Sequence, residues 1–112
     1  MKEIKAYVHR GRIGDVIAAL KNCPVWGGQR GDRRHNLAVY LVKGTLIPLD
    51  SAEQHYSLDL GEEVINEYKI ELLCEDEEVD EIIDVLSAAA RTGQSIAGWI
   101  TVTTVVKAVS IH

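Results

Sequence analysis

The spacing of apolar residues changes along the chain in a definite order, and this order constrains the fold more than any other feature of the sequence. Residues 4–9 alternate between apolar and polar side chains, which is typical of a half-buried strand. Residues 15–22 then carry apolar side chains at helical spacing, and Pro24 follows within two residues. A near-continuous apolar run at 37–42 indicates a second strand, which we expect to be buried.

The second half of the chain repeats this order. Residues 64–73 alternate again, residues 79–91 place apolar side chains on one helical stripe, and residues 99–106 are β-branched and strand-like. A further short strand at 109–111 is an open alternative. The order predicts an α+β domain over residues 1–112 with the ferredoxin-like, split βαβ arrangement (β-α-β-β-α-β), in which two helices cover one face of an antiparallel sheet.

The two halves are joined by residues 45–61, which contain Pro48 and show no sustained apolar period. We expect a long exposed loop here, and loops of this length are usually functional or mobile. The helices of such a fold leave one face of the sheet uncovered. Tyr7 and Tyr40 suggest that a partner buries this face.

Composition excludes several classes of protein. The chain has 112 residues, 46% of them hydrophobic, and a net charge of -5, so it lacks the basic footprint of a nucleic-acid-binding protein. No apolar run has the length of a membrane span, and the N-terminus lacks the apolar segment of a signal peptide. We therefore expect a soluble, cytoplasmic protein.

The sequence shows no pattern for a metal site or for catalysis. The four His residues and two Cys residues have no metal-ligand spacing, so we expect no metal, and Cys23 and Cys74 to be small buried side chains. The acidic run at 75–78 is expected to cap the second helix rather than to bind a cation. No Ser-His-Asp, Cys-His or paired-carboxylate motif indicates an enzyme.

Four short motifs in the right order and spacing resemble the PII signal-transduction family. AARTG at 89–93 is followed by a short loop and by GWITV at 98–102, as at the end of the second helix and the start of the last strand in that family. VKG at 42–44 resembles the start of the family's long T-loop, and KIE at 69–71 resembles the strand that leaves it. The resemblance covers nearly the whole chain.

The resemblance implies a homotrimeric regulator, not an enzyme, that binds an adenine nucleotide in clefts between subunits. It also implies that a T-loop at about 45–63 engages a protein partner such as a transporter or an enzyme. A glycine-rich turn can hold phosphates on its backbone N–H groups. The implied nucleotide-binding residues are Tyr7, Lys43, Gly44, Thr45, Glu71, Arg91, Thr92, Gly93, Ile96, Ala97, Gly98, Trp99, Ser110 and His112.

The departures from the family pattern weaken triphosphate binding. Trp99 stands where the family has a Lys, and Ser110 and His112 stand where it has two arginines. Because phosphates need charged partners, we expect ADP or AMP to be favoured over ATP. Pro48 replaces the amide that helps to bind 2-oxoglutarate in the family, so we expect no usual 2-oxoglutarate sensing. Trp99 itself either stacks on adenine or packs in the core.

Two charged segments bear on the expected preference for ADP or AMP over ATP. The basic segment around Arg33 and Arg34 either contacts phosphate or another anion in a neighbouring cleft, or is a solvated loop. Glu62 and Glu63 at the end of the long loop disfavour a nearby phosphate. Tyr56 lies near the place where some family members carry a modified tyrosine.

The function expected from the resemblance is nucleotide-dependent regulation, with inorganic carbon as one possible context and bicarbonate as a small anion bound beside the nucleotide. Two alternatives remain open. One is a nitrogen-regulatory PII protein, and the other is a PII-like trimer linked to metal efflux that binds nucleotides weakly or not at all.

Overall fold

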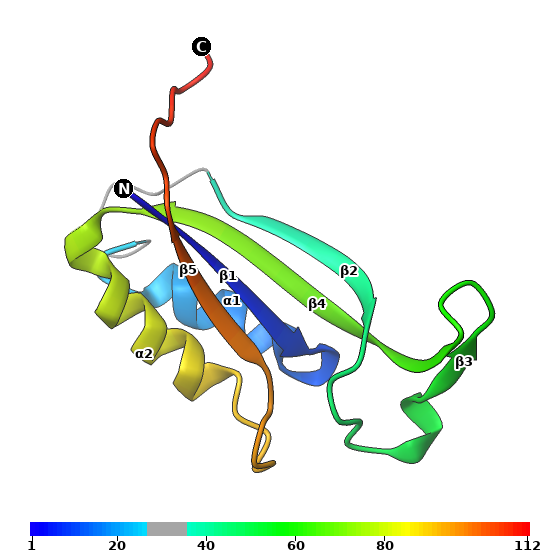
Figure 1. Cartoon of the computed structure of the whole chain (residues 1–112). Coiled ribbons are helices and arrows are strands. Elements are labelled where there is room, and N and C mark those ends of the chain that lie inside the picture. The colour runs from blue at the N-terminus through cyan, green and yellow to red at the C-terminus, as the bar shows by residue number, and fades with distance from the viewer. Residues whose placement is uncertain (27–35) are drawn as a thin grey trace.

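The computed structural model describes residues 1–26 and 36–112, and within them strands and helices follow one another in the expected order (Figure 1). The strands are β1 (Lys2–His9), β2 (Ala38–Gly44), β3 (His55–Ser57), β4 (Glu62–Cys74) and β5 (Trp99–Thr104). The α-helices are α1 (Ile13–Asn22) and α2 (Val79–Ala89). Short 3-10 turns are η1 (Arg10–Arg12), η2 (Ser51–Glu53) and η3 (Asp76–Glu78).

The strands form an antiparallel sheet in the order β2-β4-β1-β5, and β3 pairs with β4 outside this path. In the register, Ala6 of β1 lies opposite Ile70 of β4 and Ile100 of β5. Residues directly opposite each other share a face, and alternate residues of a strand point to opposite faces. This sheet with its two helices is compatible with the ferredoxin-like arrangement.

The two helices pack on one face of the sheet, where the core lies. Alternate residues of β1 and β4 meet the apolar stripes of the helices there, and burial of such side chains is the main stabilising contribution to a fold of this kind. Cys23 and Cys74 are buried in this core, as expected. Further buried core residues are Ile4, Ala6, Val8, Val16, Leu20, Ile70, Leu72, Ile82 and Leu86.

The acidic run before α2 acts as a cap. The backbone N–H of Glu75 donates to Oε1 of Glu78 at 2.7 Å, in a reciprocal capping box that begins η3. The run therefore caps the turn η3, whereas α2 begins after this turn without a side-chain cap of its own, so the expected cap of the second helix is found only at the turn that precedes it. At the other end of α2, Nε of Arg12 donates to the carbonyl oxygen of Ala89 at 3.2 Å, which ties the start of α1 to the end of α2.

The face of the sheet that the helices leave open points toward the viewer in Figure 1. The expectation that residues 37–42 form a buried strand is wrong for the single chain. Val39, Tyr40 and Leu41 are exposed because β2 is the edge strand and lies beyond the reach of the helices. An apolar edge of this kind is unusual on a monomer surface.

The segment expected to be a long exposed loop, residues 45–61, is largely exposed but contains short regular elements. This segment contains η2 and β3, and His55 of β3 pairs with Val64 of β4. Asp50 caps η2, and its side chain accepts a hydrogen bond from the backbone N–H of Ala52 at 3.0 Å. We refer to residues 45–63 as the arm; in Figure 1 it projects from the sheet at the right.

The last strand is shorter than expected, and the structure places no strand at 109–111. The backbone N–H of Val105 donates to the carbonyl oxygen of Met1 at 3.0 Å, and β1 begins at the next residue. With no strand left to pair with, the tail leaves the sheet, as Figure 1 shows.

Candidate functional site

The loop between α2 and β5, residues 90–98, closes over one end of β1. Gly93 has a positive φ of 86°, which a residue with a side chain rarely adopts. Gly98 lies directly against the carbonyl oxygen of Tyr7, and an added Cβ would overlap that oxygen. The two glycines therefore let the loop turn sharply and approach the β1 backbone closely.

A pocket of about 290 Å³ lies between this loop, the end of α2 and the helix-facing side of β1 and β5. We call it the loop pocket. Arg91 is the one cationic residue among the described residues that line it. Its lining also includes Tyr7, Leu86, Ser87, Ser95, Ile96, Ala97, Gly98 and Trp99.

A second pocket, of about 330 Å³, lies on the open face of the sheet beside the start of the arm. We call it the open-face pocket. It shares Tyr7 and Trp99 with the loop pocket, so the two pockets adjoin each other. Its lining is Tyr7, Thr45, Leu46, Glu67, Trp99 and Thr101.

Glu67 places a buried carboxylate in the open-face pocket. The residue is 4% exposed, and its Oε2 accepts a hydrogen bond from the backbone N–H of Leu46 at 3.2 Å. Burial raises the pKa of the Glu67 carboxyl, and the Leu46 N–H and the nearby His9 partly oppose this shift. The side chain therefore joins β4 to the first residues of the arm.

A second buried contact joins the arm to β1. Nδ1 of His9 accepts a hydrogen bond from the backbone N–H of Gly11 at 3.1 Å, so the ring N–H of this tautomer lies on Nε2. His9 Nε2 lies 3.0 Å from Oε2 of Glu53, the last residue of η2. The contact is sheltered from solvent, because His9 is 3% exposed.

A third contact joins the arm to the α2–β5 loop. The Nε2 amide of Gln94 donates to the carbonyl oxygen of Ile47 at 2.9 Å. Thr92 orients the same side chain, since its hydroxyl donates to Oε1 of Gln94 at 2.7 Å. The loop that lines the first pocket is thus hydrogen-bonded directly to the arm.

Comparison with known proteins finds relatives that match the full length of the chain. Over all 112 residues the chain is 28% identical to a nitrogen regulatory protein P-II of Microchaete diplosiphon, and it covers 92% of that protein. It is 26% identical to a protein of the same name from Nostoc punctiforme, with 92% coverage, and 26% identical to nitrogen regulatory protein P-II 1 of Methanothermobacter thermautotrophicus, with 90% coverage. No protein-family model matches the chain. These relatives are similar to the chain over its whole length and support a divergent member of the PII family.

The structure brings seven of the residues implied by the resemblance to the two pockets. They share one end of the sheet, where β1 ends and β5 begins. Trp99 is 59% exposed there, so the alternative that it packs in the core is wrong for the single chain. The seven residues are Tyr7, Thr45, Arg91, Ile96, Ala97, Gly98 and Trp99.

Thr92, Gly93 and Gly44 lie close to this site without lining a pocket. Thr92 and Gly93 shape the α2–β5 loop, and Gly44 lies under the carboxylate of Glu67. Lys43 is exposed, and the register opposite Asn66 places it on the helix side of β2.

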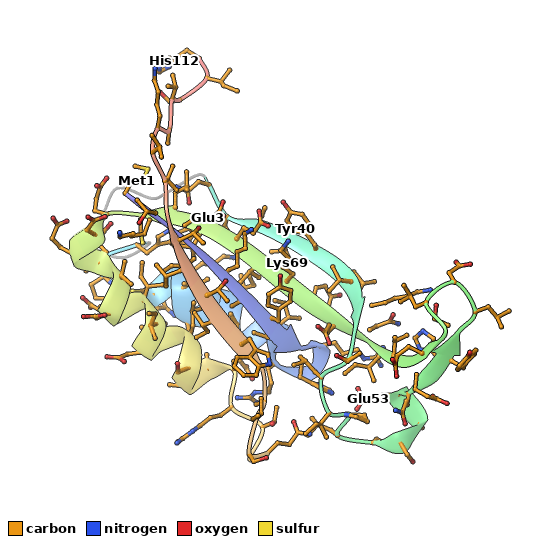
Figure 2. All side chains as sticks on the ribbon, in the orientation of Figure 1. Met1, Glu3, Tyr40, Glu53, Lys69 and His112 are labelled. Carbon is orange, nitrogen blue, oxygen red and sulfur yellow. The ribbon has the colours of Figure 1, made fainter. Side chains whose placement is uncertain are left out.

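Glu71 belongs to a different cluster on the open face. Lys69 Nζ lies 2.9 Å from Oε1 of Glu71, and the Tyr40 hydroxyl donates to Oε2 of Glu71 at 3.1 Å. Lys69 also lies 5.2 Å from the ring centroid of Tyr40, and Figure 2 shows these two side chains together on the face. The hydrogen bond from Lys69 lowers the pKa of Glu71, while the bond to Glu71 raises the pKa of Tyr40.

The C-terminal residues are separated from the pockets within one chain. Ser110 and His112 are exposed on the tail, and Figure 2 shows His112 well outside the body of the protein. Their only contact among the described residues is with each other, with Ser110 Oγ 3.2 Å from His112 Nε2. Arg33 and Arg34 lie outside the described residues.

Glu62 and Glu63 begin β4 and pair with β3, so they belong to the arm. The carboxylate that lines a pocket is Glu67.

Over residues 1–26 and 36–112, no group of three or more His, Cys, Asp or Glu side chains is placed to hold a metal ion. None of the helices in the described part of the chain combines the length and apolar character needed to cross a membrane.

Sequence reasoning missed Glu67, His9, Glu53 and Gln94. A local signal existed only for Glu53, because Asp50 followed three residues later by Glu53 is the pattern of a capping box and predicts the short helical turn η2. Glu67 lies on the polar side of an alternating strand, and its burial depends on a segment some twenty residues earlier in the chain.

Proposed function

We propose that this PII-family chain is a cytoplasmic regulatory protein that binds an adenine nucleotide at the α2–β5 loop and signals through the arm. In this proposal the nucleotide controls how the arm meets a protein partner such as a transporter or an enzyme. The chain carries out no catalysis.

One observation carries the proposal. The loop that lines the loop pocket is also the loop whose Gln94 binds Ile47 in the arm. A ligand that moves this loop changes the geometry of that hydrogen bond. A ligand shifts an equilibrium only through different contacts in its two states, and Gln94 supplies such a contact.

The charges near the pockets favour ADP or AMP over ATP. Arg91 is the one cation in the described lining of the loop pocket, and the carboxylate of Glu67 lies in the neighbouring pocket. Each additional phosphate needs a cation or several hydrogen-bond donors, and a nearby carboxylate opposes it.

A second subunit is part of the proposed site. The exposed apolar residues of β2 and the open face offer a surface for other copies of the chain. Val106 and Ile111 on the tail are almost fully exposed in the single chain. In the proposed homotrimer the tail packs on a neighbour, which brings Ser110 and His112 to that neighbour's nucleotide.

Nitrogen regulation is a second candidate, because the relatives reported above are named nitrogen regulatory proteins. A role in inorganic carbon and the binding of bicarbonate also stay predictions. Calorimetry with 2-oxoglutarate in the presence of ADP or ATP distinguishes the nitrogen role, since our proposal expects no added heat from it.

Isothermal titration of the full chain with AMP, ADP and ATP tests the main proposal. We expect ADP or AMP to bind at least as tightly as ATP. Arg91→Ala should weaken ADP binding by about tenfold, since a charged hydrogen bond is lost. Lys21→Ala, which removes an exposed cation from α1, should leave the affinity unchanged. No binding of any of the three nucleotides would refute the proposal.

A further inference from the structure

We propose that the open-face pocket binds a small organic cation, with the ammonium or guanidinium group of the ligand on the carboxylate of Glu67. This site goes beyond the proposed nucleotide function; its pocket adjoins the loop pocket and shares Tyr7 and Trp99 with it. Its ligand class follows from the charge, the hydrogen bonding and the aromatic side chains that the pocket presents.

The carboxylate of Glu67 is incompletely paired. Its Oε2 accepts the N–H of Leu46, whereas Oε1 has no hydrogen-bond donor among residues 1–26 and 36–112. Among the described residues, the buried side-chain polar atom without a partner is Nε1 of Trp26, so Oε1 of Glu67 is reached from the pocket by solvent. A carboxylate can accept about four hydrogen bonds, so Oε1 can accept one from a positive N–H group of a ligand.

The neighbouring charged groups do not supply the missing cation. Lys69 Nζ lies 6.0 Å from the ring centroid of Tyr7 but is paired with Glu71 at 2.9 Å. His9 lies beside Glu67 and directs its Nε2 to Glu53, a second carboxylate. None of the described residues that line the pocket is a Lys, Arg or His.

The same arrangement disfavours an anion. The Leu46 N–H at the base of the arm is already bound to Glu67, so bicarbonate or a dicarboxylate would have to displace that carboxylate to reach it. An anion would also lie next to the negative charge of Glu67.

The remaining walls suit the alkyl part of an organic cation. Tyr7 and Trp99 offer aromatic rings, which attract ammonium and guanidinium groups through cation–π interactions. Thr45 and Thr101 add hydroxyl groups that can accept hydrogen bonds. A volume of about 330 Å³ lies within the range of small-molecule sites.

Calorimetric titration of the full chain with putrescine and L-arginine tests the proposal, with glutarate and bicarbonate as anionic comparisons. We expect one or both cations to bind in the millimolar range or tighter and neither anion to bind at this site. Glu67→Gln should weaken the cation by about tenfold or more, because a charged hydrogen bond becomes a neutral one. The isosteric amide can still accept the Leu46 N–H, so the fold is kept.

Glu63→Gln is the matched control, since it removes an exposed carboxylate from the same strand. It should leave cation affinity unchanged. Equal weakening by both variants would indicate diffuse charge attraction and overturn the proposal. The proposal would also be overturned if neither cation binds the wild type, or if Glu67→Gln binds the cation as tightly as the wild type does. Tighter binding of glutarate than of the cations would overturn it too. ADP is titrated separately into Glu67→Gln, so a failure of the cation site is distinguished from a failure of nucleotide binding.

Discussion

The carboxylate of Glu67 occupies the space that a Cβ on residue 44 would need, so Gly44 and Glu67 fit together only because residue 44 has no side chain. The contact lies where β2 passes into the arm, and the same carboxylate holds the N–H of Leu46. The first turn of the arm is therefore set by one glycine and one buried acid.

Gly44→Ala should destabilise the protein by displacing Glu67. The new methyl group would force the carboxylate away and break its hydrogen bond to Leu46. We expect a loss of about 1–2 kcal/mol in the free energy of unfolding, measured by urea denaturation. The double variant Gly44→Ala/Glu67→Ala should lose less than the sum of the two single changes, because the clash is gone.

Gly14→Ala is the control for this substitution. Gly14 lies in α1, and a Cβ there would meet no atom within 4 Å. It should stabilise the protein by about 0.5–1 kcal/mol, because alanine favours the helix. If Gly44→Ala behaves like Gly14→Ala, Glu67 does not lie over residue 44.

Gly98→Ala should be more damaging than Gly44→Ala. Its Cβ would overlap the carbonyl oxygen of Tyr7, and a backbone atom in the middle of a sheet cannot swing aside as a carboxylate can. We expect a loss of about 2 kcal/mol or more in the free energy of unfolding. The loop pocket should open as well, so ADP affinity should fall with stability. Unchanged stability would show that the loop does not pack on β1 in this way.

Glu67 should make the protein less stable as the pH rises. Burial raises the pKa of its carboxyl above the ordinary value of 4.5, so the folded chain holds this proton to higher pH than the unfolded chain does. The contribution of Glu67 to the stability of the fold is fully present below its ordinary pKa. This contribution is lost as the pH rises through the raised pKa. Relative to wild type, Glu67→Gln should therefore gain stability as the pH rises above 4.5 through the raised pKa.

Glu71 on the same strand supplies a control of opposite sign. The hydrogen bond from Lys69 lowers the pKa of Glu71, so its contribution is present above 4.5 and lost as the pH falls through the lowered value. Relative to wild type, Glu71→Gln should lose stability as the pH rises, by a small amount because the pair is exposed to solvent. Urea titrations at pH values below and above 4.5 that give both variants the same trend would contradict the assignment.

The main elements of the fold could be predicted because their signals are local. The alternation in β1 and β4 and the helical stripe in α2 follow from neighbouring residues, and these elements form the core. Motifs around Arg91 and Gly98 also located the loop that closes the first pocket.

The rest depends on contacts between distant segments. An apolar run looks the same whether it lies in the centre of a sheet or at its edge, so nothing in the sequence of β2 revealed that Tyr40 is exposed. Glu67 reads as one of several polar residues on an alternating strand. Its carboxylate is buried only because Gly44 lies against it and the N–H of Leu46 donates a hydrogen bond to it.

Gln94→Ala should loosen the arm without unfolding the protein. The change removes the hydrogen bond to Ile47, which is the described contact between the α2–β5 loop and the arm. We expect faster amide hydrogen exchange across residues 45–63, with little change in the core strands. ADP should also lose its effect on exchange in the arm.

Gln54→Ala is the control for this experiment. Gln54 is an exposed residue of the arm, and no contact of its side chain is found among the described residues. Its substitution should leave exchange unchanged. If Gln94→Ala exchanges like the wild type with and without ADP, the α2–β5 loop does not control the arm.

The open face should assemble the protein into a trimer. Tyr40 is 41% exposed in the single chain, and it lies on the open face beside Lys69 and Glu71. Tyr40→Glu would put a second carboxylate next to Glu71 and remove a cation–π contact, so burial of this face against another copy should become unfavourable. Sedimentation velocity at micromolar concentration should show a trimer for the wild type and smaller species for the variant.

Tyr56→Glu makes the same change on the arm, at an exposed tyrosine outside this face, and should remain trimeric. A monomeric wild type, or a Tyr40→Glu variant that assembles as the wild type does, would show that this face is not the subunit interface.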